Sequence, residues 1–121
     1  YHECYNQAVN LTLQASMYTA TFTFIAKEFD AEFYELDNKI AAAAKVIPGY
    51  LGEEAWENPQ TGKISTVYYW ESLEALQQLI NDPNHILAKQ ASSRWLEKYY
   101  VTISQVLKSY GDSEINFATK E

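Results

Sequence analysis

The sequence predicts one α+β domain whose elements follow the order β-α-β-β-α-β. Three observations support this fold class. The chain has 121 residues, the length of one ordinary domain. Its apolar side chains recur with a period of two in some segments and of three to four in the segments between them. A turn-forming run, Asn58-Pro59-Gln60-Thr61-Gly62, separates the two middle segments that have the strand period.

The first strand is predicted over residues 18–25, followed by an amphipathic helix. The two strand faces differ, with Tyr18, Ala20, Phe22 and Phe24 opposed to Thr19, Thr21, Thr23 and Ile25. From Glu28 to Ile47, apolar residues recur every three or four positions, which is typical of a helix. Pro48-Gly49 ends that pattern. We expect the aromatic face of the strand to meet the helices.

The second half of the chain predicts a hairpin, two helices and a last strand. Strands are expected over residues 50–56 and 63–70, and the bulk on both faces of the latter predicts a central strand. Ser72 is a suitable N-cap for a helix that ends at Ile80. Asp82 and Pro83 have the residue types that begin another helix, expected to continue through Trp95. The last strand is expected over residues 99–110.

This order is the split βαβ arrangement of ferredoxin-like domains, which have a four-stranded antiparallel sheet with helices on one face. Two helices cannot cover the aromatic and aliphatic side chains on both faces of these strands. We therefore expect a homodimer whose two sheets pack face to face as an α+β barrel. Residues 18–111 form the expected domain, residues 1–17 an N-terminal arm or extra element, and residues 112–121 a polar tail.

Composition excludes several functions. The net charge is −7, with 9 basic and 16 acidic residues, and the basic residues are scattered singly. This is not the basic footprint of a nucleic-acid-binding protein, and it disfavours an anionic membrane surface. The sequence holds no apolar run of transmembrane length. A single cysteine, Cys4, cannot form an intrachain disulfide, which fits a cytoplasmic protein.

Several segments together resemble the antibiotic biosynthesis monooxygenase (ABM) domain family. They are Pro48-Gly49-Tyr50-Leu51-Gly52, the run from Val67 through Trp70-Glu71-Ser72 to Leu76, Asp82-Pro83-Asn84-His85, Trp95, and Tyr99 to Val101. The resemblance covers about residues 18–111. It implies a ferredoxin-like dimeric α+β barrel, in which some members are cofactor-free oxygenases of phenolic or hydroquinone substrates and some degrade haem.

The residues that the haem-degrading members use are missing here. Their first-strand Asn has no counterpart in residues 18–25, and Leu79 stands at the position of their Trp. Ala88 stands at the position of their His ligand, with His85 one turn earlier. Without that imidazole, haem iron lacks its usual axial ligand. The resemblance therefore implies no cofactor. A helical shift could let His85 replace the missing ligand, so a haem-degrading monooxygenase stays open as a disfavoured alternative.

A cofactor-free oxygenase needs a dry cavity, a base and donors for a phenolate. We take His85 as the candidate base and Tyr68 as the candidate donor, both catalytic. The expected substrate-binding residues are Trp70, Trp95, Tyr99 and Phe22. Each also has a structural interpretation: a helix cap for His85, barrel packing for the tyrosines, and core filling for the tryptophans.

Other polar residues carry weaker signals. Glu53 and Glu54 are adjacent on one strand and so face opposite sides, where one could serve as a base. Arg94 could pair with a substrate anion or form a surface salt bridge. His2 and Cys4 are too few for an ordinary metal site, and none is expected.

Two hypotheses about function stay open. The first is a cofactor-independent monooxygenase of a small aromatic molecule, with its cavity between the sheet and the helices of each protomer. The second is a non-catalytic dimeric binding or stress-related domain of the same fold, because a fold does not determine a function.

Overall fold

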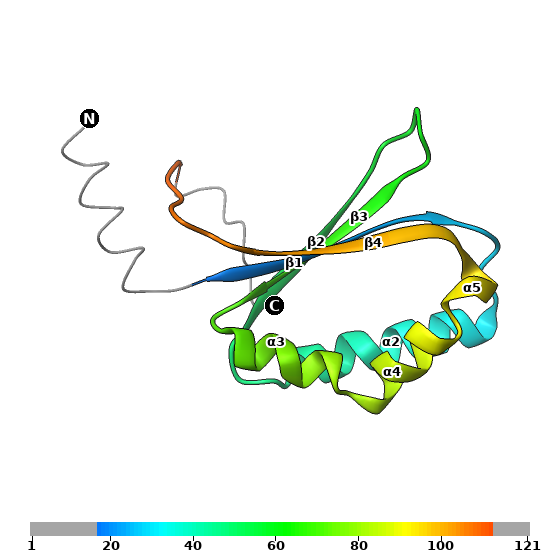
Figure 1. The fold of residues 1–121 in the computed structure, drawn as a ribbon, viewed down its shortest axis with the longest axis horizontal. Coiled ribbons are helices and arrows are strands. Elements are labelled where there is room, and N and C mark those ends of the chain that lie inside the picture. The colour runs from blue at the N-terminus through cyan, green and yellow to red at the C-terminus, as the bar shows by residue number, and fades with distance from the viewer. Residues whose placement is uncertain (1–16, 113–121) are drawn as a thin grey trace.

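The computed structural model describes residues 17–112, which form one four-stranded antiparallel sheet covered on one face by helices (Figure 1). In chain order the elements are β1 (Tyr18–Ala26), α2 (Ala31–Lys45), β2 (Tyr50–Glu57), β3 (Ile64–Trp70), α3 (Leu73–Ile80), α4 (Pro83–Gln90), α5 (Ser92–Trp95) and β4 (Leu96–Gln105). The strand order is β2-β3-β1-β4. The predicted ferredoxin-like fold is confirmed, and β3 is central as expected. The predicted arm and tail lie almost wholly outside the described residues, as do His2 and Cys4.

The strand register separates an inner face, toward the helices, from an outer face. Phe22 and Phe24 of β1 lie opposite Thr66 and Ile64 of β3, and the ring of Phe24 lies 6.4 Å from that of Phe29 ahead of α2. The aromatic face of β1 thus meets the helix layer, as its alternation predicted. The threonine face points the other way, where Thr23 Oγ1 and Ser65 Oγ lie 2.8 Å apart.

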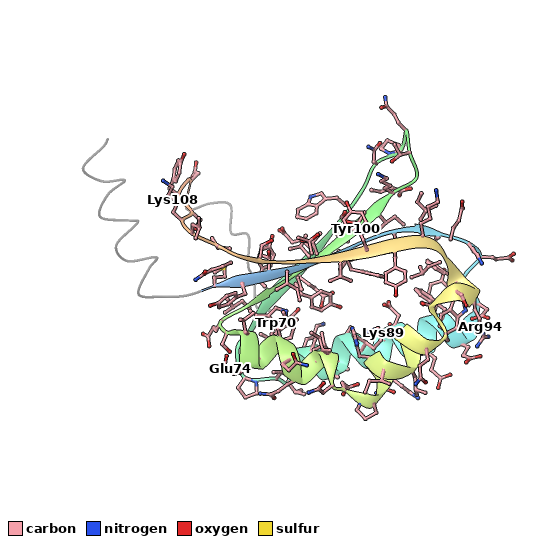
Figure 2. The ribbon with its side chains drawn as sticks, in the orientation of Figure 1. Trp70, Glu74, Lys89, Arg94, Tyr100 and Lys108 are labelled. Carbon is pink, nitrogen blue, oxygen red and sulfur yellow. The ribbon has the colours of Figure 1, made fainter. Side chains whose placement is uncertain are left out.

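The core lies between the end of β3 and α3. Trp70 is completely buried, against a set of small and aliphatic side chains and one tyrosine: Ala44, Tyr50, Ala75, Leu76 and Leu79. Figure 2 shows Trp70 between the sheet and α3. Gly49 allows this close packing, because it has a φ of 103° and a Cβ there would lie 2.8 Å from Ala75 Cβ.

The predicted caps of the helices are confirmed. Ser72 accepts a hydrogen bond from the amide of Ala75, and Asp82 accepts one from the amide of Asn84 with Pro83 in the first turn. The first helix begins later than expected, because the side chain of Asp30 is its N-cap. Asp30 Oδ1 accepts a hydrogen bond from the amide of Phe33 at 2.9 Å.

Two predicted boundaries are wrong. The helix expected from Pro83 through Trp95 breaks at Ala91, where α4 ends and the short α5 follows. The last strand, expected over residues 99–110, spans Leu96–Gln105. Its partner β1 sets both ends, since Ala26 pairs with Leu96 and Tyr18 with Gln105. Past Gln105, one further hydrogen bond joins the Val106 amide to the Met17 carbonyl at 2.9 Å.

Candidate functional site

The candidate site lies on the inner face of the sheet around Tyr68. In the strand register Tyr68 has Glu53 of β2 on one side and Ala20 of β1 on the other. The next inner row toward the hairpin holds Ala55, Thr66 and Phe22. Tyr68 therefore stands between the Glu53 carboxylate and the short side chain of Ala20, and Phe22 lies in the next row.

Hydrogen bonding and ring packing hold this group together. The Tyr50 hydroxyl donates to Glu53 Oε1 at 2.9 Å. The Tyr50 ring lies 6.5 Å from the Tyr68 ring at a steep angle, and the Tyr68 ring stacks on Trp70 at 6.3 Å. Because Trp70 is fully buried in the core, the Tyr68 ring rests on a rigid support.

A second carboxylate, Asp37 of α2, is exposed to solvent and interacts electrostatically with this group. Desolvation by the neighbouring protein, and then the negative charge of Glu53, raise the pKa of Asp37 above its ordinary value. Burial first, and then the charges of Glu53 and Asp37, raise the pKa of the Tyr68 hydroxyl well above its ordinary value. At neutral pH Tyr68 is therefore a protonated hydrogen-bond donor, and it stands beside carboxylates that accept protons.

The outer face of the sheet carries a similar pair. Glu54 faces away from the helices and accepts a hydrogen bond from the Tyr69 hydroxyl at 3.2 Å. Burial and the charge of Glu54 raise the pKa of Tyr69 to about 12. Glu53 and Glu54 thus occupy opposite faces, as their adjacency predicted, and each carboxylate has a tyrosine partner.

His85 lies elsewhere, in the first turn of α4, and is half-buried. Its ring is hydrogen-bonded to the Ile80 carbonyl at the end of α3. Burial, and then the charge of Lys89, lower the pKa of His85, so the ring is neutral at pH 7. The charged groups that act on His85 are Lys89 and Asp82, whereas those that act on Tyr68 are Glu53 and Asp37. The two predicted catalytic residues thus have different surroundings, and their joint role stays a prediction.

Phe22 and Tyr99 line a part of the inner face that the helices leave open. Their rings lie 5.7 Å apart. On β4, Tyr99, Val101 and Ile103 pair with the inner row of β1, yet they are 44%, 54% and 49% exposed. The inner face is therefore accessible along β4, and Phe22 borders that opening.

The two tryptophans predicted to bind substrate, Trp70 and Trp95, are both buried. Trp95 is 3% exposed and donates its indole N–H to Asp30 Oδ1 at 3.1 Å. Trp70 is fully buried, and its Nε1 is a buried atom without a hydrogen-bond partner in the described part of the chain. These positions suit core filling, and a contact of either residue with substrate stays a prediction.

A separate groove of about 520 Å³ runs between α2 and α4. Leu36, Leu87 and Trp95 line it, and Arg94 lies at the α5 end of the helix layer (Figure 2). The Arg94 guanidinium donates hydrogen bonds to both carboxylate oxygens of Glu32, each at 3.1 Å. This is the surface salt bridge that was one of the two expectations for Arg94. Neither Tyr68 nor His85 lines this groove.

Sequence reasoning missed Asp37 and the role of Tyr50. A signal for Asp37 was present, because residues 33, 37, 40 and 44 share one helix face and the other three are apolar. A carboxylate within an apolar stripe is uncommon unless it has a partner or a role. The bond between Tyr50 and Glu53 had no such signal.

Residues 17–112 contain no group of three or more His, Cys, Asp or Glu side chains that could hold a metal ion. Within this range, every helix is too short or too polar to cross a membrane.

Comparisons with known proteins agree with this fold. No protein-family model matches the chain. The uncharacterized protein YqjZ of Bacillus subtilis (strain 168) is 29% identical over 96 residues, 78% of this chain and 83% of YqjZ.

Two solved structures show the same architecture at low sequence identity. SnoaB, a cofactor-independent oxygenase from Streptomyces nogalater, aligns with a TM-score of 0.65 and 14% identity, over 81% of this chain and all of SnoaB. A dabb family protein with a ferredoxin-like fold from Mesorhizobium loti aligns with a TM-score of 0.54 and 15% identity, over 74% and 95% of the two chains. These likenesses show a shared ferredoxin-like fold.

Proposed function

We propose that this protein is a cofactor-independent monooxygenase of a small phenol- or hydroquinone-like molecule. The observation that carries the proposal is the inner-face cluster, in which Glu53, hydrogen-bonded to Tyr50, flanks the donor Tyr68. The likeness to SnoaB, a cofactor-independent oxygenase, supports it at the level of fold. Membership of the ABM family is part of the same proposal.

The chemistry needs only a base, a donor and molecular oxygen. Glu53 accepts the phenolic proton, and the Tyr68 hydroxyl donates a hydrogen bond to the resulting phenolate. The electron-rich anion passes an electron to oxygen, and the two radicals combine to form a carbon–oxygen bond. The hydroperoxide then loses water to leave a quinone. One oxygen atom stays in the product, the other leaves as water, and the substrate supplies all the electrons.

The other predicted residues have supporting roles in this proposal. Phe22 and Tyr99 border the part of the inner face that is accessible along β4, and they would contact the aromatic ring of a substrate. His85, neutral at pH 7, is a second proton acceptor on the α4 side. The Trp70 ring stacks on the Tyr68 ring and supports it. Trp95 is buried at the end of α5.

We further propose that the protein works in the cytoplasm as a homodimer. Large side chains on the outer face are exposed, including Trp56 at 54% and Tyr100 at 57%. Figure 2 shows Tyr100 on the side of the sheet away from the helices. A second sheet packed on this face would bury them.

A non-catalytic dimeric binding or stress-related domain is the second candidate. The observation that favours it over an oxygenase is the complete burial of Trp70 among aliphatic side chains, because a filled interior leaves less room for an aromatic substrate beside Tyr68.

The test is oxygenation of 1,4-dihydroxynaphthalene under oxygen-18 gas. We expect enzyme-dependent formation of 2-hydroxy-1,4-naphthoquinone that carries one labelled oxygen atom. Glu53→Gln keeps an acceptor for Tyr50 but removes the base, and we expect a rate loss of about 100-fold or more. Glu54→Gln is the matched control, since it makes the same change on the outer face, and its rate should stay near that of the unaltered protein. Labelling that does not depend on the protein would leave the binding domain as the function.

A further inference from the structure

We propose that Tyr50 is a one-electron redox site, which gives up an electron and its phenolic proton when an organic peroxyl radical oxidises the ring cluster around it. The ring cluster consists of Tyr50, Tyr68 and Trp70. This inference goes beyond the proposed oxygenation and does not depend on it, because the oxidant is a radical that reaches the protein and no phenolic substrate takes part. It assigns a chemistry to Tyr50, a buried titratable residue that transfers no proton in the oxygenation.

A β-bulge at the start of β2 brings the Tyr50 hydroxyl and the Glu53 carboxylate together. In a regular strand, residues three apart point to opposite faces of the sheet. The pairing of β2 with β3 shifts between Tyr50 and Gly52, and Gly52 has a φ of 149°, which favours glycine. Tyr50 and Glu53 therefore share the inner face, where the hydroxyl donates to Glu53 Oε1 at 2.9 Å. The phenol thus has an acceptor for its proton already in place.

Three aromatic rings in mutual contact connect Tyr50 to a partly exposed residue. The Tyr68 ring stacks on the Trp70 ring at 6.3 Å with the planes 10° apart, and the Trp70 ring lies 5.7 Å from the Tyr50 ring. The Tyr50 and Tyr68 rings are 6.5 Å apart. Tyr68 is partly exposed, whereas Tyr50 and Trp70 are 8% and 0% exposed. An electron can therefore pass between neighbouring rings to an oxidant at Tyr68, although Tyr50 itself is buried.

The proton acceptors decide where the oxidised state settles. Trp70 Nε1 is buried and has no hydrogen-bond partner within residues 17–112, which is uncommon for a buried N–H. An oxidised Trp70 thus has no group that takes its proton, and as a radical cation it remains a strong oxidant. Tyr50 can lose its electron to Trp70 and its proton to Glu53 together, because their hydrogen bond is already formed. The neutral tyrosyl radical at Tyr50 is therefore the stable end of the path.

The electrons and protons of this step balance. The peroxyl radical takes one electron from the ring cluster and one proton from water, and it is reduced to a hydroperoxide. Tyr50 supplies the electron and is oxidised to the neutral radical, while its phenolic proton passes to Glu53. Glu53 then releases that proton to water. The net change is the transfer of one hydrogen atom from Tyr50 to the peroxyl radical.

The experiment treats the protein with trichloromethylperoxyl radical, made by pulse radiolysis, and records electron paramagnetic resonance spectra of frozen samples. The samples are frozen after the radicals on exposed tyrosines have combined. We expect a long-lived tyrosyl radical in the unaltered protein and its loss in Tyr50→Phe, which keeps the ring. Tyr34→Phe is the matched control, since it removes the hydroxyl of an exposed tyrosine and should keep the signal.

A second pair of variants tests the proton acceptor. Glu53→Gln can still accept the hydrogen bond of Tyr50 but cannot take its proton, so the radical yield should fall about tenfold or more. Glu54→Gln makes the same change beside Tyr69 on the outer face and should keep the yield. Circular dichroism checks that each variant is folded.

Three results would overturn the inference. They are the absence of a long-lived tyrosyl radical in the unaltered protein, an unchanged signal in Tyr50→Phe, and equal losses in Glu53→Gln and Glu54→Gln. The radical test contains no phenolic substrate. A Tyr50 radical that forms in a protein without labelled product in the oxygenation assay would therefore remove the oxygenase function and support the redox site.

Discussion

Trp95 and Asp30, 65 residues apart in the chain, are joined by a hydrogen bond of 3.1 Å from the indole N–H to Oδ1. The same oxygen accepts the Phe33 amide at 2.9 Å, so one atom both caps α2 and holds α5. Trp95 is buried, and its ring lies 5.5 Å from that of Phe33. This junction joins the start of the first helix to the point where the chain enters β4.

We predict that Asp30→Ala destabilises the protein by about 2 kcal/mol. The change removes a helix cap and leaves the buried indole N–H of Trp95 without its acceptor. Urea unfolding monitored by tryptophan fluorescence gives the free energy of unfolding. Glu35→Ala is the control, because it removes an acidic side chain of α2 whose exposed pair with Lys39 contributes little. Equal losses in the two variants would contradict this role of Asp30.

We predict that Tyr68→Phe lowers the oxygenation rate by about 100-fold and leaves the fold intact. The substitution removes the donor to the phenolate but keeps the ring that stacks on Trp70. Tyr69→Phe is the matched control, since Tyr69 is adjacent but bonds Glu54 on the outer face. The labelled product is measured for both variants. A Tyr68→Phe variant as active as the unaltered protein would exclude Tyr68 as the donor.

Much of the fold was predictable because its signals are local. Alternation of aromatic and threonine residues in β1 is a property of the strand itself, and so are the caps at Ser72 and Asp82. The break at Ala91 has no such signal, because Ala91-Ser92-Ser93 contains neither proline nor glycine. It places Trp95 in the core, against Asp30, which is a tertiary requirement.

The candidate site was predictable only in part, for the same reason. Tyr68 could be chosen from its strand, but its neighbours depend on register. The pairing of β2 with β3 shifts between Tyr50 and Gly52, and after this shift Glu53 lies opposite Tyr68. Alternation alone shows that Glu53 and Glu54 face opposite ways, and it does not show which one lies inside.

His85 provides a pH test that does not depend on substrate. Burial and the charge of Lys89 lower the pKa of His85 below its ordinary value of 6.5, while Asp82 and the bond to the Ile80 carbonyl oppose this. The unfolded chain therefore binds a proton at higher pH than the folded one. Stability attributed to neutral His85 is fully present above pH 6.5 and is lost as the pH falls from there through the lowered pKa.

We predict that the free energy of unfolding of the unaltered protein falls between pH 7.5 and pH 5.5, and that His85→Gln removes most of this slope. Urea unfolding at several pH values over this roughly two-unit range measures it. Lys89→Gln should also flatten the slope, because removal of its positive charge brings the pKa of His85 back toward its ordinary value. Lys39→Gln removes a positive charge that pairs with Glu35 and should leave the slope unchanged. The same slope in His85→Gln as in the unaltered protein would show that other groups set the pH dependence.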